Sequence, residues 1–572
     1  MYNTARYIFE LMSSAPTYSS TRGGSRDRGL SFVAAVMRGL ALDAGLFVPD
    51  IIPSVSRREL LEWRKCAHYW EVAFRVMRKY VPEEEIPNKD LEKLVQEVYG
   101  EGGKFRDAGV TPIRRMDNAP GEFGENGAAP LYVLELFHGP TFAFKDVALQ
   151  FLGRLFSYVL SQTGDRMTVL AATSGDTGSS AIHGLSGQPG VECFVMFPKG
   201  GPSDIQQQQM TTVADANVHC IAVEGDFDDC QRIVKSLFKQ RDFRDGVKLG
   251  AVNSINWARI LAQIVYYFWA YFRVLDDLED GDSSERAINF TVPTGNFGDI
   301  LAGYYAQRMG LPTDKLVVAT NQNDILHRFF ETGVYHYTGA SVCTPAPSMD
   351  ISVSSNFERF LYHCSGDDAV ECSRMMREFA STNQIKVSQK TFEAAQLCMK
   401  SGCAGDKDLL QTIAAVKLAD KDGYVLDPHS ACGVAVSTRA TLSGKANAAA
   451  AYLQAVAATN GTPCVALACA HWAKFPKVYD AALSEGLDEI APHLKHDLSK
   501  VPKVLRDLSQ LEQRVVTKAP EEVVIRDYVL ETLPYKVHLD QKKGTGTAMW
   551  ITAGLVVAAA AMAGIVWSRS RK

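Results

Sequence analysis

Lys145 is a candidate for covalent chemistry because of its place in a predicted helix. It lies in the segment HGPTFAFKDVALQFLGRLFSYVL. A helix starting at about Phe144 would place Lys145 on the same face as four apolar residues: Ala148, Leu149, Leu152 and Phe156. A second stripe of that helix carries polar residues: Asp146, Gln150, Arg154 and Ser157. Desolvation on the apolar face lowers the pKa of a lysine, and a neutral amine can form a Schiff base with a carbonyl compound. The alternative is a lysine whose amine reaches the surface along its aliphatic stem.

Two turns, each between a predicted strand and a predicted helix, are candidate anion sites. The first, residues 174–180 (SGDTGSS), follows TVLAAT, and its backbone N–H groups and hydroxyls suit a carboxylate or a phosphate. Its alternative interpretation is an ordinary capped turn. The second, residues 295–299 (GNFGD), follows AINFTVPT, and its two glycines permit close approach of the backbone to a phosphate. It matches neither the G-x-G-x-x-G nor the Walker pattern, so neither a dinucleotide site nor a P-loop is indicated. Together with Lys145, the two turns suggest a phosphorylated carbonyl cofactor and an anionic substrate.

Three other polar segments are less decisive. Residues 253–259 (NSINWAR) place amide, hydroxyl and guanidinium groups within two helical turns, a donor set that suits phosphate. The alternative is a capped helix start with an exposed arginine. The segments DPHS (427–430) and AHWAKF (470–475) each contain a histidine, which we interpret as structural. Neither a G-x-S-x-G elbow nor an H-E-x-x-H zinc helix occurs in the sequence.

The composition is that of a globular protein with more than one domain. The chain has 572 residues, of which 46% are hydrophobic and 22% charged, and its net charge is −5. Without a basic excess, nucleic acid is not an expected partner. The 12 cysteines form no C-x-x-C pair or zinc-like spacing, which predicts no metal site and favours a reducing compartment.

The pattern of predicted elements favours an α/β fold. Residues 30–100 are expected to be mostly helical. Beyond them, β-branched strands alternate with helices, as in MTVLAAT before GSSAIHGL and AINFTVPT before DILAGYYAQRM. Such alternation is typical of a sheet that is at least partly parallel.

The C-terminal segment predicts a transmembrane helix. Residues 547–567 (TAMWITAGLVVAAAAMAGIVW) contain no charge, and a helix of that length spans about 31 Å. Tryptophans lie near both ends and basic residues flank the segment, as expected of interfacial anchors. We therefore expect a cytosol-facing protein that is tail-anchored to an organelle membrane. The sequence does not show which membrane this is. The alternative is an Ala-rich helix packed in the globular core.

Many ordered motifs resemble one known family, the threonine synthases of the fungal and bacterial type. The similarity covers about residues 19–515 and rests on runs in colinear order: SSTRG at Ser19, HGPTFAFKD around Lys145, ATSGDTGSSA at Ala172, FPKG at Phe197, GDFDDCQ at Gly225, AVNSINWARI at Ala251, PTGNFGD at Pro293, PSMDI at Pro347, SSNFER at Ser354 and DPHSACG at Asp427.

The resemblance implies a fold and a cofactor. The fold is pyridoxal phosphate (PLP) fold type II, the tryptophan-synthase β-like arrangement, here with a helical N-terminal domain and the C-terminal transmembrane helix. Together with the sequence patterns described above, this predicts an N-terminal extension (1–18), a helical N-terminal domain (19–115), a PLP-binding catalytic core (116–515), a linker (516–546), a tail anchor (547–567) and a basic tail (568–572). The membrane tail lies outside the usual pattern of the family.

The resemblance also implies roles for individual residues. Lys145 would bind PLP covalently, and the cofactor phosphate would be bordered by Gly295, Asn296, Phe297, Gly298 and Asp299. The substrate α-carboxylate would be held by Ser174, Asp176 and Thr177. Candidates for the substrate phosphate are Lys199, Ser254, Asn256 and Arg259. Cys469 replaces a threonine that the family places near the pyridine nitrogen, and a thiol is a weaker hydrogen-bond partner than a hydroxyl. The run FPKGGPSDIQ also lacks a basic residue found in the family's FPKGRVSPIQ-like run.

The implied reaction converts O-phospho-L-homoserine and water into L-threonine and phosphate. Two alternatives remain open at this point. One is a PLP-dependent phospho-lyase that forms 2-oxobutyrate, ammonia and phosphate from the same substrate. The other is a noncatalytic membrane-bound scaffold that keeps the fold. The sequence does not distinguish a monomer from a dimer.

Overall fold

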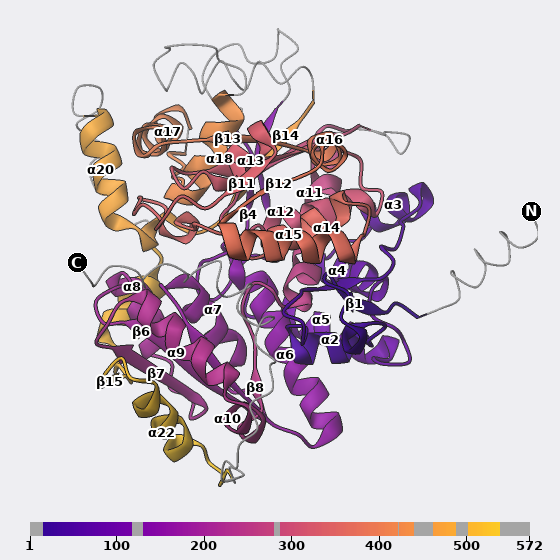
Figure 1. The fold of residues 1–572 in the computed structure, drawn as a ribbon. Helices are drawn as coiled ribbons and strands as arrows, with labels where there is room; N and C mark the ends of the chain where they lie inside the picture. The colour runs from indigo at the N-terminus through magenta and orange to yellow at the C-terminus, as the bar shows by residue number, and fades with distance from the viewer. Residues whose placement is uncertain are drawn as a thin grey trace, which may run out of the picture.

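The computed structural model describes residues 15–116, 130–279, 286–420, 422–439, 462–487 and 501–537. Within them, two mainly parallel sheets form the body of the chain, and a group of N-terminal helices packs beside them (Figure 1).

The N-terminal region is helical, as the sequence predicts. A short antiparallel pair, β1 (Tyr18–Ser20) with β2 (Phe47–Pro49), accompanies helices α2 (Phe32–Arg38), α3 (Arg57–Arg64), α4 (Tyr69–Arg78) and α5 (Asn88–Tyr99), with the 3-10 turn η1 (Ser25–Asp27) between the strands. Ser31 caps α2, and Ser56 with Glu59 forms a capping box on α3. The apolar stripes of α4 and α5 are buried in the main core, which joins this region to the body of the two sheets.

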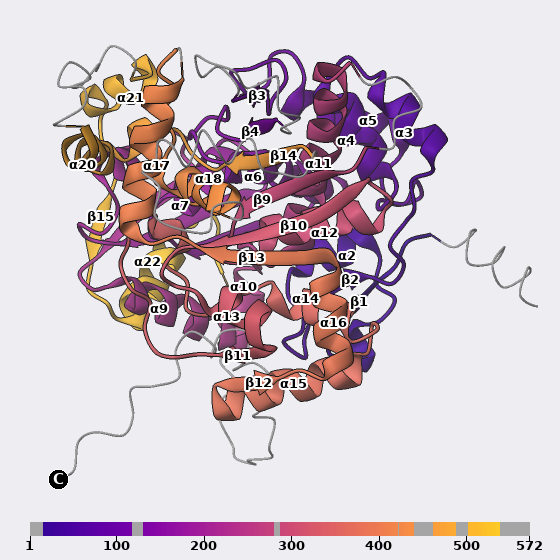
Figure 2. The same ribbon diagram turned by 90° about the horizontal axis from the view of Figure 1, so that it is seen from above.

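The larger sheet has six strands in the order β13-β10-β9-β14-β4-β3. Its strands are β3 (Ile113–Arg115), β4 (Leu131–Glu135), β9 (Ile288–Pro293), β10 (Thr313–Thr320), β13 (Met399–Cys403) and β14 (Cys464–Ala468). All pairings are parallel except that of β3 with β4. Figure 2 shows β14, β9, β10 and β13 running side by side, with α18 (Pro428–Arg439) and α17 (Asp406–Ala419) beside them.

Several other elements surround this sheet. A small antiparallel pair joins β11 (Val334–His336) to β12 (Gln384–Lys386). The helices and turns are α12 (Gly298–Arg308), α13 (Ile325–Thr332), η2 (Pro347–Met349), α14 (Phe357–Cys364), α15 (Ala369–Thr382), α16 (Gln389–Cys398), η3 (Trp472–Lys474), α20 (Pro476–Leu487), α21 (Lys503–Asp507) and η6 (Leu508–Gln510).

The second sheet has five strands in the order β15-β7-β6-β5-β8, all paired in parallel. Its strands are β5 (Met167–Ala172), β6 (Val191–Pro198), β7 (Val218–Val223), β8 (Leu249–Gly250) and β15 (Val516–Lys518). Its helices are α7 (Asp176–Leu185), α8 (Asp204–Thr211), α9 (Phe227–Lys239), α10 (Arg241–Gly246) and α22 (Glu522–Thr532). Both strand-turn-helix units predicted from the alternating pattern are confirmed: β5 leads into α7, and β9 leads into α12.

The predicted linker at 516–546 is wrong for its described part. Val516–Lys518 forms strand β15 against β7, and α22 follows at the edge of the sheet near α9 (Figure 1). Ile525, Val529 and Leu533 recur every four residues and are buried with the apolar face of α9. The charges of this segment lie between the apolar positions, so a helical stripe was mistaken for a linker composition.

The fold class needs one correction. The α/β body is as predicted, but no helix in the described ranges is long and apolar enough to cross a membrane. The predicted span at 547–567 lies outside those ranges, and no described helix supports a transmembrane element in the fold class. The absence of charge over 21 residues meets a length and polarity requirement, which does not by itself establish a membrane helix. The longest described helix, α11 (Trp257–Asp277), also has 21 residues but carries four charges and is buried in the protein core.

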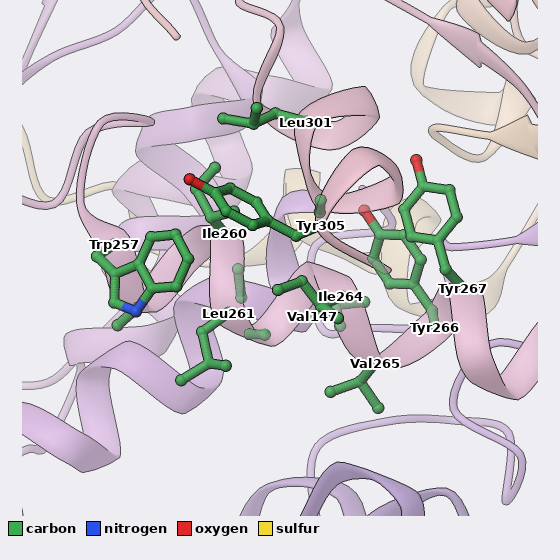
Figure 3. Packing of buried hydrophobic residues seen from close by; sticks show 14 of the residues in the cluster. Val147, Trp257, Ile260, Leu261, Ile264, Val265, Tyr266, Tyr267, Leu301 and Tyr305 are labelled. Atoms are coloured by element: carbon green, nitrogen blue, oxygen red, sulfur yellow. The ribbon is translucent and has the colours of Figure 1, made fainter. Parts of the chain in front are cut away.

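Helices α6 (Lys145–Thr163) and α11 lie at the centre of the main core. Figure 3 shows Trp257, Leu261 and Val265 of α11 in the same packed region as Val147 of α6 and Leu301 and Tyr305 of α12. Both helices are buried along most of their length, so the residues at their N-terminal ends are fixed by packing from several sides.

Helix α6 packs against α7 at unusually close range through two glycines. A Cβ atom built on Gly153 would collide with the carbonyl oxygen of Gly184, and one on Gly184 would collide with that of Leu149. Neither glycine has a positive φ, so the requirement is for space between the helices. This contact sets the distance between Lys145 and the 174–180 turn at the start of α7.

We expect Gly153→Ala to lower the free energy of unfolding by about 1–3 kcal/mol or more, because the backbones of α6 and α7 must separate. Thermal unfolding measures the effect. Gly405→Ala is the matched control, since the nearest atom to its added Cβ is the Asp408 carboxylate at an ordinary 3.5 Å. Equal melting temperatures for the two variants would contradict the close-packing account.

Candidate functional site

Lys145 is the first residue of α6 and its side chain is buried. Its Nζ lies 3.4 Å from the Ser348 hydroxyl and 3.9 Å from Oδ2 of Asp176. Burial lowers the pKa of the amine, and the positive charge of Lys474 adds to that effect, while Asp176 opposes it. The predicted burial of Lys145 is therefore confirmed, and the amine is poised for Schiff-base chemistry.

Two residues of the polar stripe of this helix, Asp146 and Gln150, are buried. The chain before α6 folds over its first turn, so that the Asp146 carboxylate accepts hydrogen bonds from the N–H (2.8 Å) and hydroxyl (2.7 Å) of Thr141. A loop that folds back over a helix start can supply buried hydrogen-bond partners to polar residues of the helix. The helical pattern alone does not show such partners.

The end of β14 fixes the position of Lys145. The N–H of Phe144 donates to the carbonyl of Cys469 at 2.7 Å, and the N–H of His471 donates to the carbonyl of Phe142 at 3.1 Å. An isolated bridge pairs Ala143 with Ala470 between these two bonds. The start of α6 is thus tied by backbone hydrogen bonds to the carboxyl edge of the six-stranded sheet.

A buried ion pair lies next to Lys145. Nζ of Lys474 is 2.6 Å from Oδ1 of Asp176 and donates to the carbonyl of Thr141 at 2.8 Å, and Gln206 donates to the same Asp176 oxygen at 2.9 Å. Burial alone would raise the pKa of Asp176, but the charges of Lys474 and Lys145 outweigh it and hold the pKa well below its ordinary value. Asp176 is therefore an anion whose charge is matched mainly by Lys474.

This geometry changes the role implied for the 174–180 turn. The anionic Asp176 side chain would repel a substrate carboxylate, so only its backbone fits that role. Ser174 is exposed and Thr177 is half-buried at the start of α7, where hydroxyls and helix N–H groups suit an anion. Gly175 has φ +151°, and a Cβ there would meet the Gln206 side chain at 2.6–2.7 Å.

We expect Asp176→Asn to lower the free energy of unfolding by about 3–5 kcal/mol at pH 7, because it leaves Lys474 buried without its counter-charge. A carboxyl with a depressed pKa stabilises the fold above its unfolded pKa of about 3.9, and that contribution is lost as the pH falls further. The difference in the free energy of unfolding between the wild type and the variant should therefore become smaller below about pH 4.

Chemical unfolding at several pH values tests this expectation. Asp229→Asn is the control, because Asp229 also has a lowered pKa but pairs with Arg232 at the surface. A surface pair of this kind contributes about 1 kcal/mol or less. A pH-independent difference for Asp176→Asn would contradict the ion-pair assignment.

The 295–299 turn connects β9 to α12 and has the shape of an anion cradle. Phe297 is left-handed (φ 62°), α12 begins at Gly298, and a Cβ on Gly295 would come within 3.0 Å of the Ser348 carbonyl. The adjacent segment 354–356 holds the turn: the N–H of Asn356 donates to the Asn296 carbonyl at 3.1 Å. Its side-chain amide donates both to that carbonyl and to the carbonyl of Ser254, each at 3.2 Å.

Asp299 belongs to this turn, but its side chain faces α11. Its Oδ1 accepts hydrogen bonds from the hydroxyls of Tyr266 (2.5 Å) and Tyr267 (3.0 Å). Burial raises the pKa of Asp299 to about 6, although both tyrosines act in the opposite direction. A carboxyl group would repel a cofactor phosphate, so Asp299 supports the cradle through its backbone and its tyrosine contacts.

Of the four candidates for a substrate phosphate, Arg259 has the most suitable environment. It is buried, burial lowers its pKa to about 10, and its Nε has no hydrogen-bond partner among the described residues. Its Nη1 donates to the Val252 carbonyl at 3.3 Å. The guanidinium remains charged at neutral pH and suits an incoming phosphate.

The other three candidates differ in their surroundings. Asn256 is a helix cap: its amide oxygen accepts from the N–H of Ala258 (3.1 Å) and its amide nitrogen donates to the carbonyls of Val36 and Ala251. For Asn256, the structure therefore shows the capped helix start that was the alternative interpretation of residues 253–259. Ser254 is half-buried and hydrogen-bonded to Ser355 at 3.0 Å. Lys199 is exposed and pairs with Glu224 at 3.2 Å, so the structure does not bring it into the buried cluster.

Cys469 is buried directly after β14, and burial raises its thiol pKa well above the ordinary value. Its sulfur is therefore a protonated thiol at neutral pH. Its backbone carbonyl accepts the hydrogen bond from Phe144, the residue before Lys145, which places Cys469 among the site residues.

Sequence reasoning missed several residues that the fold brings to Lys145. Lys474 and Ser348 contact it or its ion pair, and behind Ser348 lie His429 and Asp427. All four belong to motifs that were noticed in the sequence. Their spacing along the chain does not show that they lie close together. That follows only from the order of strands β9, β10 and β14 in the sheet.

The geometry is that of a PLP site: a buried, easily deprotonated lysine lies near a glycine cradle at the carboxyl edge of a parallel sheet. The sequence also matches the family model "Pyridoxal-phosphate dependent enzyme" over residues 105–413. Two further family models match on either side of it: "Threonine synthase N terminus" over residues 17–99 and "Threonine synthase, C-terminal" over residues 430–529.

Whole-chain relatives agree. The chain is 44% identical to threonine synthase of Schizosaccharomyces pombe over 83% of this chain and 91% of that one, and 40% identical to the Pseudomonas aeruginosa enzyme over 90% and 97%. The structure resembles PLP-bound threonine synthase of Brucella melitensis (TM-score 0.78, 40% identity, 91% of this chain and 100% of that one). It resembles the yeast enzyme equally well (TM-score 0.79, 37% identity, 90% and 98%). The chain belongs to the threonine synthase family.

Proposed function

We propose that this chain converts O-phospho-L-homoserine and water into L-threonine and phosphate, the last step of threonine biosynthesis. The observation that carries the proposal is the Lys145 amine, which is buried, has a lowered pKa and lies near the glycine cradle. A PLP-dependent lyase requires such an amine both to bind the cofactor and to move protons.

The residues fit the cofactor. Lys145 would bind its aldehyde, the backbone of 295–298 would border its phosphate, and the Cys469 thiol would face its pyridine nitrogen. The left-handed Phe297 and the start of α12 at Gly298 support the phosphate assignment, because the free N–H groups of a helix start suit an anion. The chemistry that PLP supplies when bound is withdrawal of electrons from the substrate Cα.

The substrate groups have complementary positions. Arg259, with its unpartnered Nε, and Ser254 would bind the γ-phosphate. Ser174, Thr177 and the backbone at the start of α7 would bind the α-carboxylate. Because Lys474 already matches the charge of Asp176, that carboxylate does not have to be paired by the substrate.

Lys145 would then move the protons of the reaction. Its neutral amine would remove the Cα proton and one Cβ proton, which allows the C–O bond at Cγ to break as phosphate leaves, and would return protons to Cγ and Cα. Water adds at Cβ, and the product carries the hydroxyl of threonine. The pocket must hold this water in position and keep other water away from the bound substrate, since premature hydrolysis would yield 2-oxobutyrate and ammonia.

Product analysis with O-phospho-L-homoserine tests the proposal. We expect equimolar threonine and phosphate from the wild type, and a loss of turnover of at least about 10³-fold for Lys145→Ala because one residue supplies both the covalent link and the base. Borohydride reduction followed by peptide mapping should place the pyridoxyl label on Lys145.

Lys104→Ala is a suitable control, because partial desolvation also lowers the pKa of Lys104, but this residue is exposed and donates to the His183 carbonyl outside the catalytic cluster. It should keep both the label and turnover. Formation of 2-oxobutyrate and ammonia as the main products would instead identify a phospho-lyase. A label on another lysine would refute the assignment of Lys145.

A further inference from the structure

Ser348 brings a second buried network to the Lys145 amine. It lies in the 3-10 turn η2, and its hydroxyl accepts from Nζ of Lys145 at 3.4 Å. Its own backbone N–H donates to Nε2 of His429 at 3.1 Å. The position of the hydroxyl is thus linked to a histidine at the start of α18.

The contacts of His429 determine where its proton lies. A backbone N–H can only donate, so Nε2 of His429 must be an unprotonated acceptor. The proton is then on Nδ1, which lies 2.7 Å from Oδ1 of Asp427 and donates to it. Both side chains are almost fully buried, at 2% and 1% exposure, so the ring has one orientation and one tautomer.

Asp427 also holds the end of β14, to which the start of α6 and therefore Lys145 is hydrogen-bonded. Its Oδ2 accepts from the hydroxyl of Ser430 and from the N–H of Ala470 at 3.3 Å. The Ser430 hydroxyl in turn accepts from the N–H of Cys469 at 2.9 Å. One buried carboxylate therefore fixes the end of β14, which anchors α6, and through His429 also fixes Ser348.

We propose that Ser348 orients the Lys145 amine for proton transfer, and that His429 and Asp427 are positioning residues that hold Ser348 in place. The inference rests on the proposed function for its catalytic part. A neutral amine has two hydrogens and one lone pair. When one hydrogen is donated to Ser348, the lone pair is free to accept the substrate Cα proton.

The charges around the amine explain why this hydroxyl matters. Asp176 lies 3.9 Å from Nζ and favours the ammonium form, which has no lone pair, whereas Lys474 and Arg259 disfavour it. A neutral hydroxyl partner gives the amine a hydrogen-bond acceptor that does not demand a charge. Without Ser348, Asp176 is the nearest remaining acceptor described for the amine.

The test compares Ser348→Ala, His429→Ala and the double variant. We expect each single variant to lower kcat about tenfold or more with less than about threefold change in KM, because the amine is misoriented while substrate contacts remain. The double variant should be no worse than the more impaired single variant, since His429 acts through Ser348. His429→Gln, whose amide oxygen can accept the Ser348 N–H, should recover part of the loss.

A second readout does not depend on turnover. PLP is added to the cofactor-free protein at fixed pH, and the growth of the absorbance of the lysine-bound cofactor is followed. The neutral amine attacks the aldehyde of PLP, and Ser348, held by His429, orients that amine. Ser348→Ala and His429→Ala should therefore both slow this growth severalfold. If the wild type made no threonine, the proposed function would fail, but these rates would still test the orientation of Lys145.

His363→Ala is the matched control. His363 is likewise buried, with Nδ1 2.5 Å from the Asp367 carboxylate, but its Nε2 bonds to Tyr305 in the helical core. We expect this variant to lose stability and keep kcat and the rate of cofactor attachment. Additive losses in the double variant, or unchanged rates in folded Ser348→Ala, would overturn the proposal. If His429→Ala does not fold, Ser348→Ala and His429→Gln decide the question.

Discussion

The structure depends on holding a buried lysine amine beside a carboxylate while the pKa of that amine stays below its ordinary value. Lys145 lies 3.9 Å from Asp176, a distance at which an anion normally stabilises a charged lysine. Lys474 lies closer to the same carboxylate, at 2.6 Å, and matches its charge. Desolvation therefore prevails at Lys145 and lowers its pKa, so that one ion pair leaves the neighbouring amine available for chemistry.

The two sheets are arranged so that this cluster can form. Asp176 follows β5 of the five-stranded sheet, whereas the glycine cradle and Cys469 follow β9 and β14 of the six-stranded sheet. Helix α6 links the two because its start is hydrogen-bonded to the end of β14 and its middle packs against α7 without side chains between them. The site thus lies where the carboxyl ends of strands from both sheets meet.

Part of this account could be read from the sequence. The helix of Lys145, its burial and the two strand-turn-helix units followed from local periodicity and turn chemistry, and the family followed from ordered motifs. The partner of Asp176 could not be predicted, since Lys474 is 298 positions away and only the tertiary fold brings it close. For the same reason, Asn256 and Asp299 were assigned to ligands although their side chains serve the fold.

The errors outside the site have other causes. The segment from 516 was interpreted as a linker because its charges hid the apolar spacing of Ile525, Val529 and Leu533, whose partner surface on α9 is visible only in the structure. The membrane assignment of the charge-free segment at 547–567 rests on length and composition alone, and that segment lies outside the described residues.

The most direct test of the central claim is the pKa of the Lys145 amine in the cofactor-free protein. It can be obtained from the pH dependence of the rate at which the amine reacts with added pyridoxal phosphate, with peptide mapping to confirm the modified residue. The account predicts an apparent pKa below that of an unperturbed lysine, about 10.4. A value at or above 10.4 would show that Asp176 keeps the amine charged and would contradict the account.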